Sequence, residues 1–250
     1  MNHFGGVTQT VILAAGNGSR LAREWPGVPK PLMTVGGVPL LAHALSHARD
    51  SGCLEAIIVV GHEREQVAAA ARAMSSGLEI RFVETPDPSA PNGVSLLAAE
   101  QLARPRFFLQ MVDHLFDDLV LPKLAGTPFA YGEGGRVLVD RAPGEIDLED
   151  ATKVRLAGDR VVAIGKGIEP WDAIDAGCFA LTGAIFTALR ETPPSEPKTV
   201  SSGMRQLAAR GLLRAVDVGG LDWVDVDTPA DRESAERLLA QRAVVGGTSR

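Results

Sequence analysis

Apolar runs alternate with helical periodicity along the first half of the chain. Strands are expected at 11–13, 56–60, 78–83 and 106–112, and the continuous apolar runs among them are typical of strands covered on both faces. Helices are expected at 39–52, 63–74 and 94–102, where apolar residues recur at helical spacing or alanine is frequent. An alternation of strands and helices predicts right-handed crossovers and a mostly parallel sheet.

The pattern changes beyond residue 126. Strands are expected at 128–131, 136–140, 151–156, 160–164, 175–181 and 213–218, and helices at about 185–189 and 200–209. The segment 151–164 alternates around a turn at Gly158, which predicts a hairpin. Thr228 and Pro229 open the last helix as its N-cap and first residue. We therefore predict an α/β fold with a Rossmann-like, doubly wound, mixed and mostly parallel sheet and a small β-rich lobe.

Composition narrows the class of protein. With 250 residues, of which 45% are hydrophobic and 22% charged, the chain is globular and long enough to bury a substantial core. The formal net charge of −6 argues against a nucleic-acid partner. No apolar run approaches the roughly 18 residues of a membrane span, and residues 1–6 show no signal-peptide pattern. Cys53 and Cys178 form no metal-type pair, so a cytoplasmic location is expected.

A glycine-rich loop, Leu13-Ala-Ala-Gly-Asn-Gly-Ser-Arg20, follows the first strand. Gly16 and Gly18 allow a tight turn that brings backbone N–H groups close to a ligand. Ser19 adds a hydroxyl, and Arg20 adds a charged planar group suited to phosphate oxygens. The loop is not a Walker A motif, because no Gly-Lys-Ser/Thr follows the glycines. It is not the dinucleotide fingerprint either, because position 21 is leucine.

Lys30 lies between Pro29 and Pro31. Both prolines fix φ, so we expect the lysine amine to be held on a stiff segment. A phosphate-cradling loop followed by a positioned lysine predicts a polyphosphate site.

Aspartates follow two of the extended segments. Asp113 comes directly after 106–112, where an acidic residue needs a partner, and Mg²⁺ is the natural partner where phosphates gather. Asp225 and Asp227 share one face of an extended segment, because they are two residues apart, and adjacent carboxylates repel unless a cation lies between them. The alternative is that these aspartates serve only as acidic residues at the N-termini of the helices that follow them. We predict Asp113, Asp225 and Asp227 as metal ligands, with the choice between the last two left open.

His43 and His47 are four residues apart on the expected helix 39–52. This spacing suits a metal pair, but no third ligand is evident nearby. We therefore expect both side chains on an exposed helix surface.

Together these motifs resemble the sugar-nucleotidyltransferase superfamily, and they look most like its CTP:inositol-1-phosphate cytidylyltransferases. The anchors of the resemblance are Leu13–Arg20, Pro29-Lys30-Pro31, Asn92-Gly93-x-Ser95, Asp113-His114, Glu149-Asp-Ala-Thr-Lys-Val154, Ile164-Gly-Lys166, Asp175-x-Gly177 and Trp223-x-Asp-x-Asp-Thr-Pro229. The resemblance implies a single domain with the nucleotide-diphospho-sugar transferase fold. Its NTP-binding part would span about 7–126, its acceptor-side part about 127–228 and its C-terminal helix 229–243.

The resemblance also implies roles for groups of residues. The expected nucleotide-binding residues are Leu13, Ala14, Ala15, Gly16, Gly18, Ser19, Arg20 and Lys30, with Asn92, Gly93 and Ser95 near the base. The expected acceptor-binding residues are Lys153, Lys166, Asp175 and Gly177. The lysines lie on or beside the hairpin and would meet the acceptor phosphate, although most lysines are simply exposed. The expected catalytic residues are Arg20, Lys30 and Asp113.

The implied reaction transfers a nucleotidyl group from an NTP to a phosphorylated polyol or sugar and releases pyrophosphate. CTP and inositol 1-phosphate are the expected substrates, and Mg²⁺ is the expected cofactor. Many such enzymes are fused to a membrane-embedded transferase. We expect none in this chain, so a separate membrane transferase would use the product. A homodimer is left open.

Other functions stay open at the level of sequence. Related cytidylyltransferases act on phosphonates or phosphocholine-type acceptors, and other sugar-1-phosphate nucleotidyltransferases share the loop. A GT-A glycosyltransferase shares the Asp-x-Asp pattern of 225–227 but does not need a loop for a terminal triphosphate. An NAD-dependent dehydrogenase is disfavoured by the leucine at position 21, and a non-catalytic nucleotide sensor by the presence of the metal aspartates.

Overall fold

The computed structural model describes residues 6–16, 25–74, 76–126, 128–144 and 147–247, with side chains up to residue 242. The helices are α1 (Leu40–Asp50), α2 (Arg64–Ala73), α3 (Asn92–Ala98), α4 (Val120–Ala125), α5 (Ala184–Arg190), α6 (Val200–Ala209) and α7 (Pro229–Gly247), with a 3₁₀ turn, η2, at Lys30–Leu32. The strands are β1 (Gln9–Ala14), β2 (Thr34–Val35), β3 (Val38–Pro39), β4 (Glu55–Val60), β5 (Glu79–Glu84), β6 (Arg106–Met111), β7 (His114–Phe116), β8 (Gly135–Asp140), β9 (Lys153–Ala157), β10 (Arg160–Gly165), β11 (Ala173–Thr182), β12 (Leu213–Asp217) and β13 (Trp223–Asp225).

One nine-stranded mixed sheet runs through the molecule in the order β5-β4-β1-β6-β11-β8-β12-β10-β9. The first four strands of this order pair in parallel, and β11 then pairs antiparallel with β6. The parallel strands belong to the N-terminal part of the chain, where strands and helices alternate, and their carboxyl ends lie at one edge. In open sheets of this kind, ligands bind beyond the carboxyl ends of the strands.

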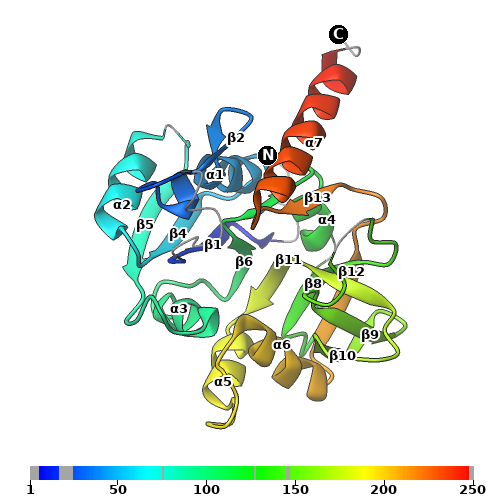
Figure 1. The fold of residues 1–250 in the computed structure, drawn as a ribbon. Coiled ribbons are helices and arrows are strands. Elements are labelled where there is room, and N and C mark those ends of the chain that lie inside the picture. The colour runs from blue at the N-terminus through cyan, green and yellow to red at the C-terminus, as the bar shows by residue number, and fades with distance from the viewer. Residues whose placement is uncertain (1–5, 17–24, 75, 127, 145–146, 248–250) are drawn as a thin grey trace.

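Helices cover both faces of the parallel strands (Figure 1). Leu41 and Leu45 of α1 pack with Val67 of α2 against the side chains that β1 and β4 present on one face. Leu96 of α3 and Ile185 of α5 pack with helix α6 against the other face. Both faces of β1 and β4 are buried, which explains the continuous apolar runs 11–14 and 56–60 within these strands.

The C-terminal strands form the expected β-rich lobe. The hairpin β9–β10 is present, and β9 also pairs with β11, opposite residues 173–174. Strands β11, β8, β12, β10 and β9 each pair with the next in this order. The pairing of β9 with β11 therefore closes these five strands into a ring. Strand β11 belongs to both parts of the molecule, since its other half pairs with β6. The lobe is therefore rigidly joined to the parallel part of the sheet.

The prediction of a strand at 128–131 is wrong, because these residues form no strand in the structure. Phe129 instead lies under the guanidinium group of Arg136, whose Cζ is 4.4 Å from the ring centroid. Arg136 also donates to the carbonyl oxygen of Pro128 at 3.2 Å. The carbonyl of Pro128 is thus satisfied by a buried side chain and not by a neighbouring strand.

The last helix, α7, rises from the body of the molecule at the top of the view (Figure 1). As expected, Thr228 caps it: the Thr228 hydroxyl accepts from the amide of Asp231 at 3.3 Å. Arg242 ties the helix to β7 by donating to the carbonyl oxygen of Phe116 at 2.8 Å. No helix in the described ranges combines the length and the apolar character that a membrane crossing requires.

Candidate active site

Two segments far apart in sequence meet at the carboxyl end of β6. The chain leaves β6, passes through Asp113 and enters β7, which pairs antiparallel with β13 so that His114 lies opposite Asp225. The backbone N–H of Val226 donates to the carbonyl oxygen of Asp113 at 2.9 Å. This short ladder brings Asp225 beside Asp113.

Lys30, from the N-terminal part of the chain, contacts Asp113 and Asp227. We call Lys30, Asp113, His114, Asp225 and Asp227 the cluster. Its Nζ donates to Oδ2 of Asp113 at 2.6 Å and to Oδ1 of Asp227 at 2.5 Å. The lysine side chain is only 8% exposed, whereas those of Asp113 and Asp227 are 24% and 34% exposed. It belongs to the η2 turn, which begins after the extended residue Pro29. The expectation of a held amine agrees with this geometry. Asp227, however, lies beyond the end of β13, so it does not share a strand face with Asp225.

The imidazole of His114 lies near both Asp113 and Asp225. Its Nδ1 is 2.9 Å from Oδ1 of Asp113 and 3.6 Å from Oδ1 of Asp225. The ring stacks on the indole of Trp223, with centroids 6.3 Å apart and planes 8° from parallel. Trp223 is itself held by its Nε1, which donates to Oδ2 of Asp140 at 3.0 Å.

Burial and neighbouring charges shift the pKa values of the cluster residues in opposite directions. Burial alone would lower the pKa of Lys30, but the carboxylates of Asp113 and Asp227 raise it above its ordinary value. Burial would raise the pKa of Asp113, yet Lys30 and His114 hold it well below the usual range. Burial lowers the pKa of His114, but Asp225 and Asp113 outweigh it and raise that pKa to about 9. Opposite charges thus stabilise one another here.

The residues present fit a divalent cation. Asp113, His114 and Asp225 each offer one ligand atom, and these atoms lie within 4.8 Å of one another. Oδ1 of Asp225 is buried and has no hydrogen-bond partner within the described part of the chain. Burial raises the pKa of this carboxyl group. A buried carboxylate oxygen that accepts no hydrogen bond is costly, and a cation would satisfy it. Of the three predicted ligands, Asp113 and Asp225 are therefore grouped for a metal, while Oδ1 of Asp227 contacts Lys30.

The glycine-rich loop is described only in part. Leu13, Ala14 and Ala15 are buried at the end of β1, and a Cβ atom at Gly16 would meet no atom of the described residues within 4 Å. The expectations for Gly18, Ser19 and Arg20 fall outside the residues that the structure describes.

Asn92, Gly93 and Ser95 connect α3 to its neighbours. Oδ1 of Asn92 accepts from the backbone N–H of Val200 at 2.8 Å, at the start of α6. A Cβ atom at Gly93 would lie 2.4 Å from the carbonyl oxygen of Lys198, so only glycine fits. The hydroxyl of Ser95 is buried and bonds to Thr85 at 3.1 Å. These contacts position the start of α3 next to the end of β5, and the predicted contact with the base stays a prediction.

The predicted acceptor residues divide into two groups. Asp175 and Gly177 lie beside the cluster: Oδ1 of Asp175 accepts from the N–H of Gly177 at 2.8 Å, and burial raises the Asp175 pKa to about 6. Lys153, 14% exposed, pairs with Glu169 at 3.3 Å, and Lys166 pairs with Asp150. Lys153 lies opposite Ile174 in β11, which brings it next to Asp175 in the sheet.

The sequence missed the role of His114 and Trp223. Both are part of quoted motifs, but their stacking depends on the pairing of β7 with β13, which are each three residues long. His47 was also misjudged: its side chain is 8% exposed and its ring lies 6.2 Å from that of Phe116. The adjacency of His114 to Asp113 was the one available signal.

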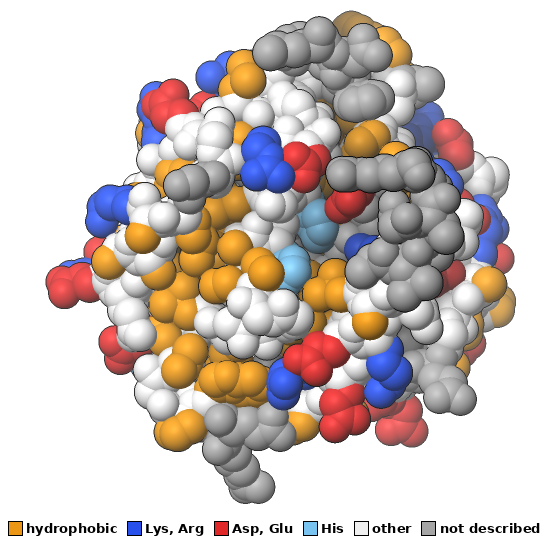
Figure 2. Space-filling view, turned by 90° about the horizontal axis from the view of Figure 1, so that it is seen from above, with side chains coloured by type: hydrophobic (Ala, Val, Ile, Leu, Met, Phe, Trp, Pro, Cys, Tyr) orange, Lys and Arg blue, Asp and Glu red, His pale blue; other side chains and the backbone are white. Residues whose placement is uncertain are grey.

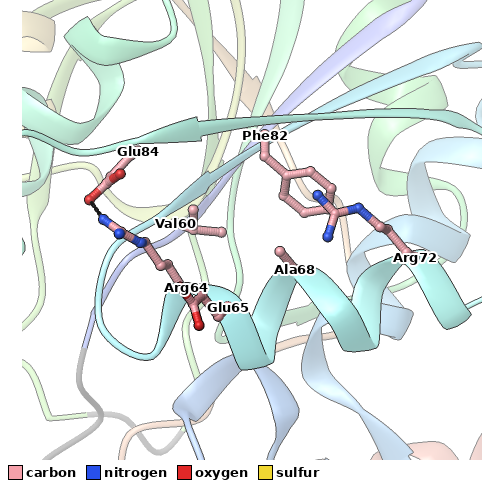
Figure 3. Close-up of a pocket in the computed structure, with 7 residues that line it drawn as sticks. All are labelled: Val60, Arg64, Glu65, Ala68, Arg72, Phe82 and Glu84. Atoms are coloured by element: carbon pink, nitrogen blue, oxygen red, sulfur yellow. Dashed lines mark hydrogen bonds and ion pairs between the residues drawn. The ribbon is translucent and has the colours of Figure 1, made fainter.

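A separate pocket lies between α2 and the edge strand β5 (Figure 3). Arg64 pairs with Glu84 there, and the Cζ of Arg72 is 4.7 Å from the ring centroid of Phe82. None of the cluster residues lines it. Because its arginines contact neighbouring side chains, we assign no function to this pocket.

The surface seen from above carries histidine side chains near its centre, with acidic side chains close by (Figure 2). Hydrophobic side chains gather over a broad area to one side. Basic side chains in the described part of this face are scattered and form no continuous patch. Such a face suits a small ligand better than a nucleic acid.

Comparison with known proteins places the chain among nucleotidyltransferases. It is 39% identical over 238 residues to the "Bifunctional IPC transferase and DIPP synthase" of Rubrobacter xylanophilus, covering 94% of this chain and 52% of that protein. It is 33% identical over 254 residues to the "CMP-5'-(3-aminopropyl)phosphonate synthase" of Streptomyces rubellomurinus, covering 91% and 38%. The chain thus spans about half the length, or less, of these curated relatives.

A solved structure agrees with these relatives. The inositol-1-phosphate CTP transferase from T. maritima superposes with a TM-score of 0.83 at 26% identity, over 91% of this chain and 92% of that one. The predicted α/β nucleotide-diphospho-sugar transferase fold is thereby confirmed. The family model for a MobA-like NTP transferase domain matches residues 10–141. Because that match spans more than half of the 250 residues, the chain belongs to the MobA-like NTP transferase domain family.

Proposed function

We propose that this protein is a Mg²⁺-dependent cytidylyltransferase that transfers CMP from CTP to inositol 1-phosphate. The observation that carries the proposal is the convergence of Lys30, Asp113 and Asp225 at the carboxyl end of β6. The likeness to an inositol-1-phosphate CTP transferase over most of both chains supports the choice of substrates.

The proposed reaction needs no general base. A phosphate oxygen of the acceptor attacks the α-phosphorus of CTP and forms a new P–O bond. The bond from that phosphorus to the bridging oxygen of the β-phosphate breaks, and pyrophosphate leaves with the electron pair. Because the attacking phosphate is already an anion at neutral pH, the protein has to align the two substrates and neutralise charge.

Asp113 and Asp225 are the proposed metal ligands. Mg²⁺ bound there would neutralise charge on the phosphates of the nucleotide. Asp227 would hold Lys30, and through it Asp113, in place. An ammonium group has three N–H donors, and two of those of Lys30 go to carboxylates. The third can donate to a phosphate oxygen, which is the catalytic role we propose for Lys30.

The remaining binding roles follow from the resemblance. We propose that the backbone of residues 15–19 and the side chain of Arg20 hold the β- and γ-phosphates. Lys153 and Lys166 would exchange their carboxylate partners for the acceptor phosphate, and Asp175 would accept from an acceptor hydroxyl. A homodimer and a separate membrane transferase that uses the product also stay proposals.

The test is a grid of pyrophosphate release. CTP, UTP, GTP and ATP are each combined with inositol 1-phosphate, glucose 1-phosphate, phosphocholine and 3-aminopropylphosphonate in the presence of Mg²⁺. Release with CTP and inositol 1-phosphate alone is the expected result. Release with another pair would replace the substrates and keep the chemistry. No release in any combination would contradict the proposal.

A phosphonate is the second candidate acceptor. The similarity to a CMP-aminopropylphosphonate synthase favours it, because the chemistry of attack by a phosphonate oxygen is the same. The aminopropylphosphonate wells of the grid separate the two candidates directly.

A further inference from the structure

The ring of His114 is enclosed on several sides. Trp223 stacks on it, Phe116 lies 5.9 Å away between centroids, and Asp113 and Asp225 approach its Nδ1. Gly177 lies against the opposite part of the ring. The side chain is only 12% exposed. A ring confined in this way has one orientation.

Gly177 is the residue that makes this orientation possible. Its φ is +74°, and a Cβ atom there would lie 2.2 Å from Nε2 and 2.3 Å from Cδ2 of His114. Carbon atoms of packed groups approach to about 3.5–4.0 Å, so any other residue at 177 would have to displace the ring. The requirement for glycine is thus steric as well as conformational.

The acceptors around Nδ1 determine what this nitrogen does. Both nearby oxygens belong to carboxylates, which in their ionised form only accept hydrogen bonds. Nδ1 lies within hydrogen-bond distance of Oδ1 of Asp113, whereas Oδ1 of Asp225 is at the longer distance of 3.6 Å. Because Nδ1 faces a carboxylate and Nε2 faces Gly177, the geometry favours His114 as a group that orients the Asp113 carboxylate.

We propose that His114 is a positioning residue that holds Asp113 by the hydrogen bond at Nδ1 and so keeps it at metal-ligand distance from Asp225, and that Gly177 is required because it seats the His114 ring. The inference rests on the metal site of the proposed function. It gives Gly177 a role that does not depend on contact with the acceptor. The glycine lies in the stretch of β11 where the register with β8 shifts, between Asp175 and Phe179.

The experiment measures the affinity of the protein for Mn²⁺ alone, by water-proton relaxation, without nucleotide or acceptor. Gly177→Ala is expected to weaken Mn²⁺ binding by about tenfold or more, as loss of groups that orient metal ligands commonly does. The matched control is Gly158→Ala, a turn glycine with a φ of +68° and no atom within 4 Å of the added Cβ. It carries the same backbone strain and should bind Mn²⁺ like the wild type.

A second pair of variants distinguishes the effect of the His114 ring on Mn²⁺ binding from that of the backbone at Gly177. His114→Asn keeps an N–H donor close to the position of Nδ1 and should retain most of the Mn²⁺ affinity, whereas His114→Ala should lose it. In the His114→Ala background, Gly177→Ala should have little further effect, because the ring it displaces is gone. Circular dichroism confirms that each variant is folded before titration.

Three results would overturn the inference. One is wild-type Mn²⁺ affinity in Gly177→Ala. Another is equal loss in the Asn and Ala variants of His114. The third is an undiminished effect of Gly177→Ala when His114 is alanine. Failure of the wild type to bind Mn²⁺ would overturn the metal site as well, while the pyrophosphate grid would still test nucleotidyl transfer independently.

Discussion

Lys30 illustrates how far single residues could be anticipated. Its restraint by prolines and the need of Asp113 for a partner were both visible in the sequence. That the two would satisfy each other was not, because the contact depends on a fold that brings residues 83 positions apart within 2.6 Å. The stacking of His114 on Trp223 was hidden for the same reason.

Replacing Lys30 should cost stability as well as turnover. Lys30→Met leaves Asp113 and Asp227 without their shared cation, and breaking such a partly buried arrangement should lower the free energy of unfolding by about 2 kcal/mol. Urea unfolding measures the change, and Mg²⁺ should recover part of it. Lys166→Met is the control, since the Lys166 side chain is 61% exposed and exposed pairs contribute little. Equal stability of the two variants would contradict the role of Lys30.

Because His47 is buried, we expect the free energy of unfolding to depend on pH. Burial, with smaller effects of His43 and Arg242, lowers its pKa to about 4, below the value of about 6.5 in an unfolded chain. Between these values the unfolded chain binds a proton that the native protein does not, so stability falls as the pH is lowered from 6.5 towards 4. The limiting slope is about 1.4 kcal/mol per pH unit.

His47→Gln should remove this contribution. From pH 6.5 to 5, its free energy of unfolding should fall by about 1.5 kcal/mol less than that of the wild type. Both proteins carry the same carboxylates, so the difference between their urea curves isolates the histidine. Parallel pH profiles would show that His47 is not buried as a neutral group.

At the level of elements, burial on both faces made the strands of the parallel part predictable. Strands β1 and β4 contain the continuous apolar runs 11–14 and 56–60 for that reason. The segment that contains β13 was expected to be extended, but its pairing with β7 was not predicted, and the pair β2–β3 was missed because strands of two residues have no detectable periodicity. The false strand at 128–131 arose because its aromatic residues suit a strand, while the carbonyl oxygen of Pro128 accepts from the side chain of Arg136, eight residues later.

The junction of α3 with α6 carries a prediction at this scale. Asn92→Ala removes the acceptor for the N–H of Val200 and should destabilise the protein by about 1 kcal/mol, as loss of a helix cap does. Asn92→Asp keeps the acceptor and places a negative charge at the start of α6, so it should be at least as stable as the wild type. Thermal unfolding compares them. Equal melting temperatures for both variants would refute the capping role.

For the whole molecule, the cluster is assembled from both ends of the chain. Lys30 and Asp113 come from the N-terminal part, and Asp225 and Asp227 follow the β-rich lobe. Because strand β11 belongs to both parts of the sheet, the lobe is fixed relative to these residues. The order of the strands in the sheet was not predicted, whereas the α/β class and the family resemblance were evident from the sequence. The closure of the lobe through β9 was not, since one strand must pair with two others that are distant in sequence.

Loss of the central aspartate should abolish turnover and leave the fold intact. In Asp113→Ala, Lys30 still contacts Asp227 and His114 still faces Asp225, so no cation is left without a partner. We expect a native circular dichroism spectrum and no detectable pyrophosphate release at any Mg²⁺ concentration. Retained turnover at saturating Mg²⁺ would remove Asp113 from the catalytic site.

The most direct test of the proposed function follows the attacking oxygen. Inositol 1-phosphate with ¹⁸O in its terminal phosphate oxygens is incubated with CTP, Mg²⁺ and the protein, and the products are analysed by ³¹P NMR. The proposed attack on the α-phosphorus predicts ¹⁸O in the bridge between the two phosphorus atoms of the product and none in pyrophosphate. Cleavage of CTP without a product that links both phosphorus atoms, or ¹⁸O in pyrophosphate, would contradict the account.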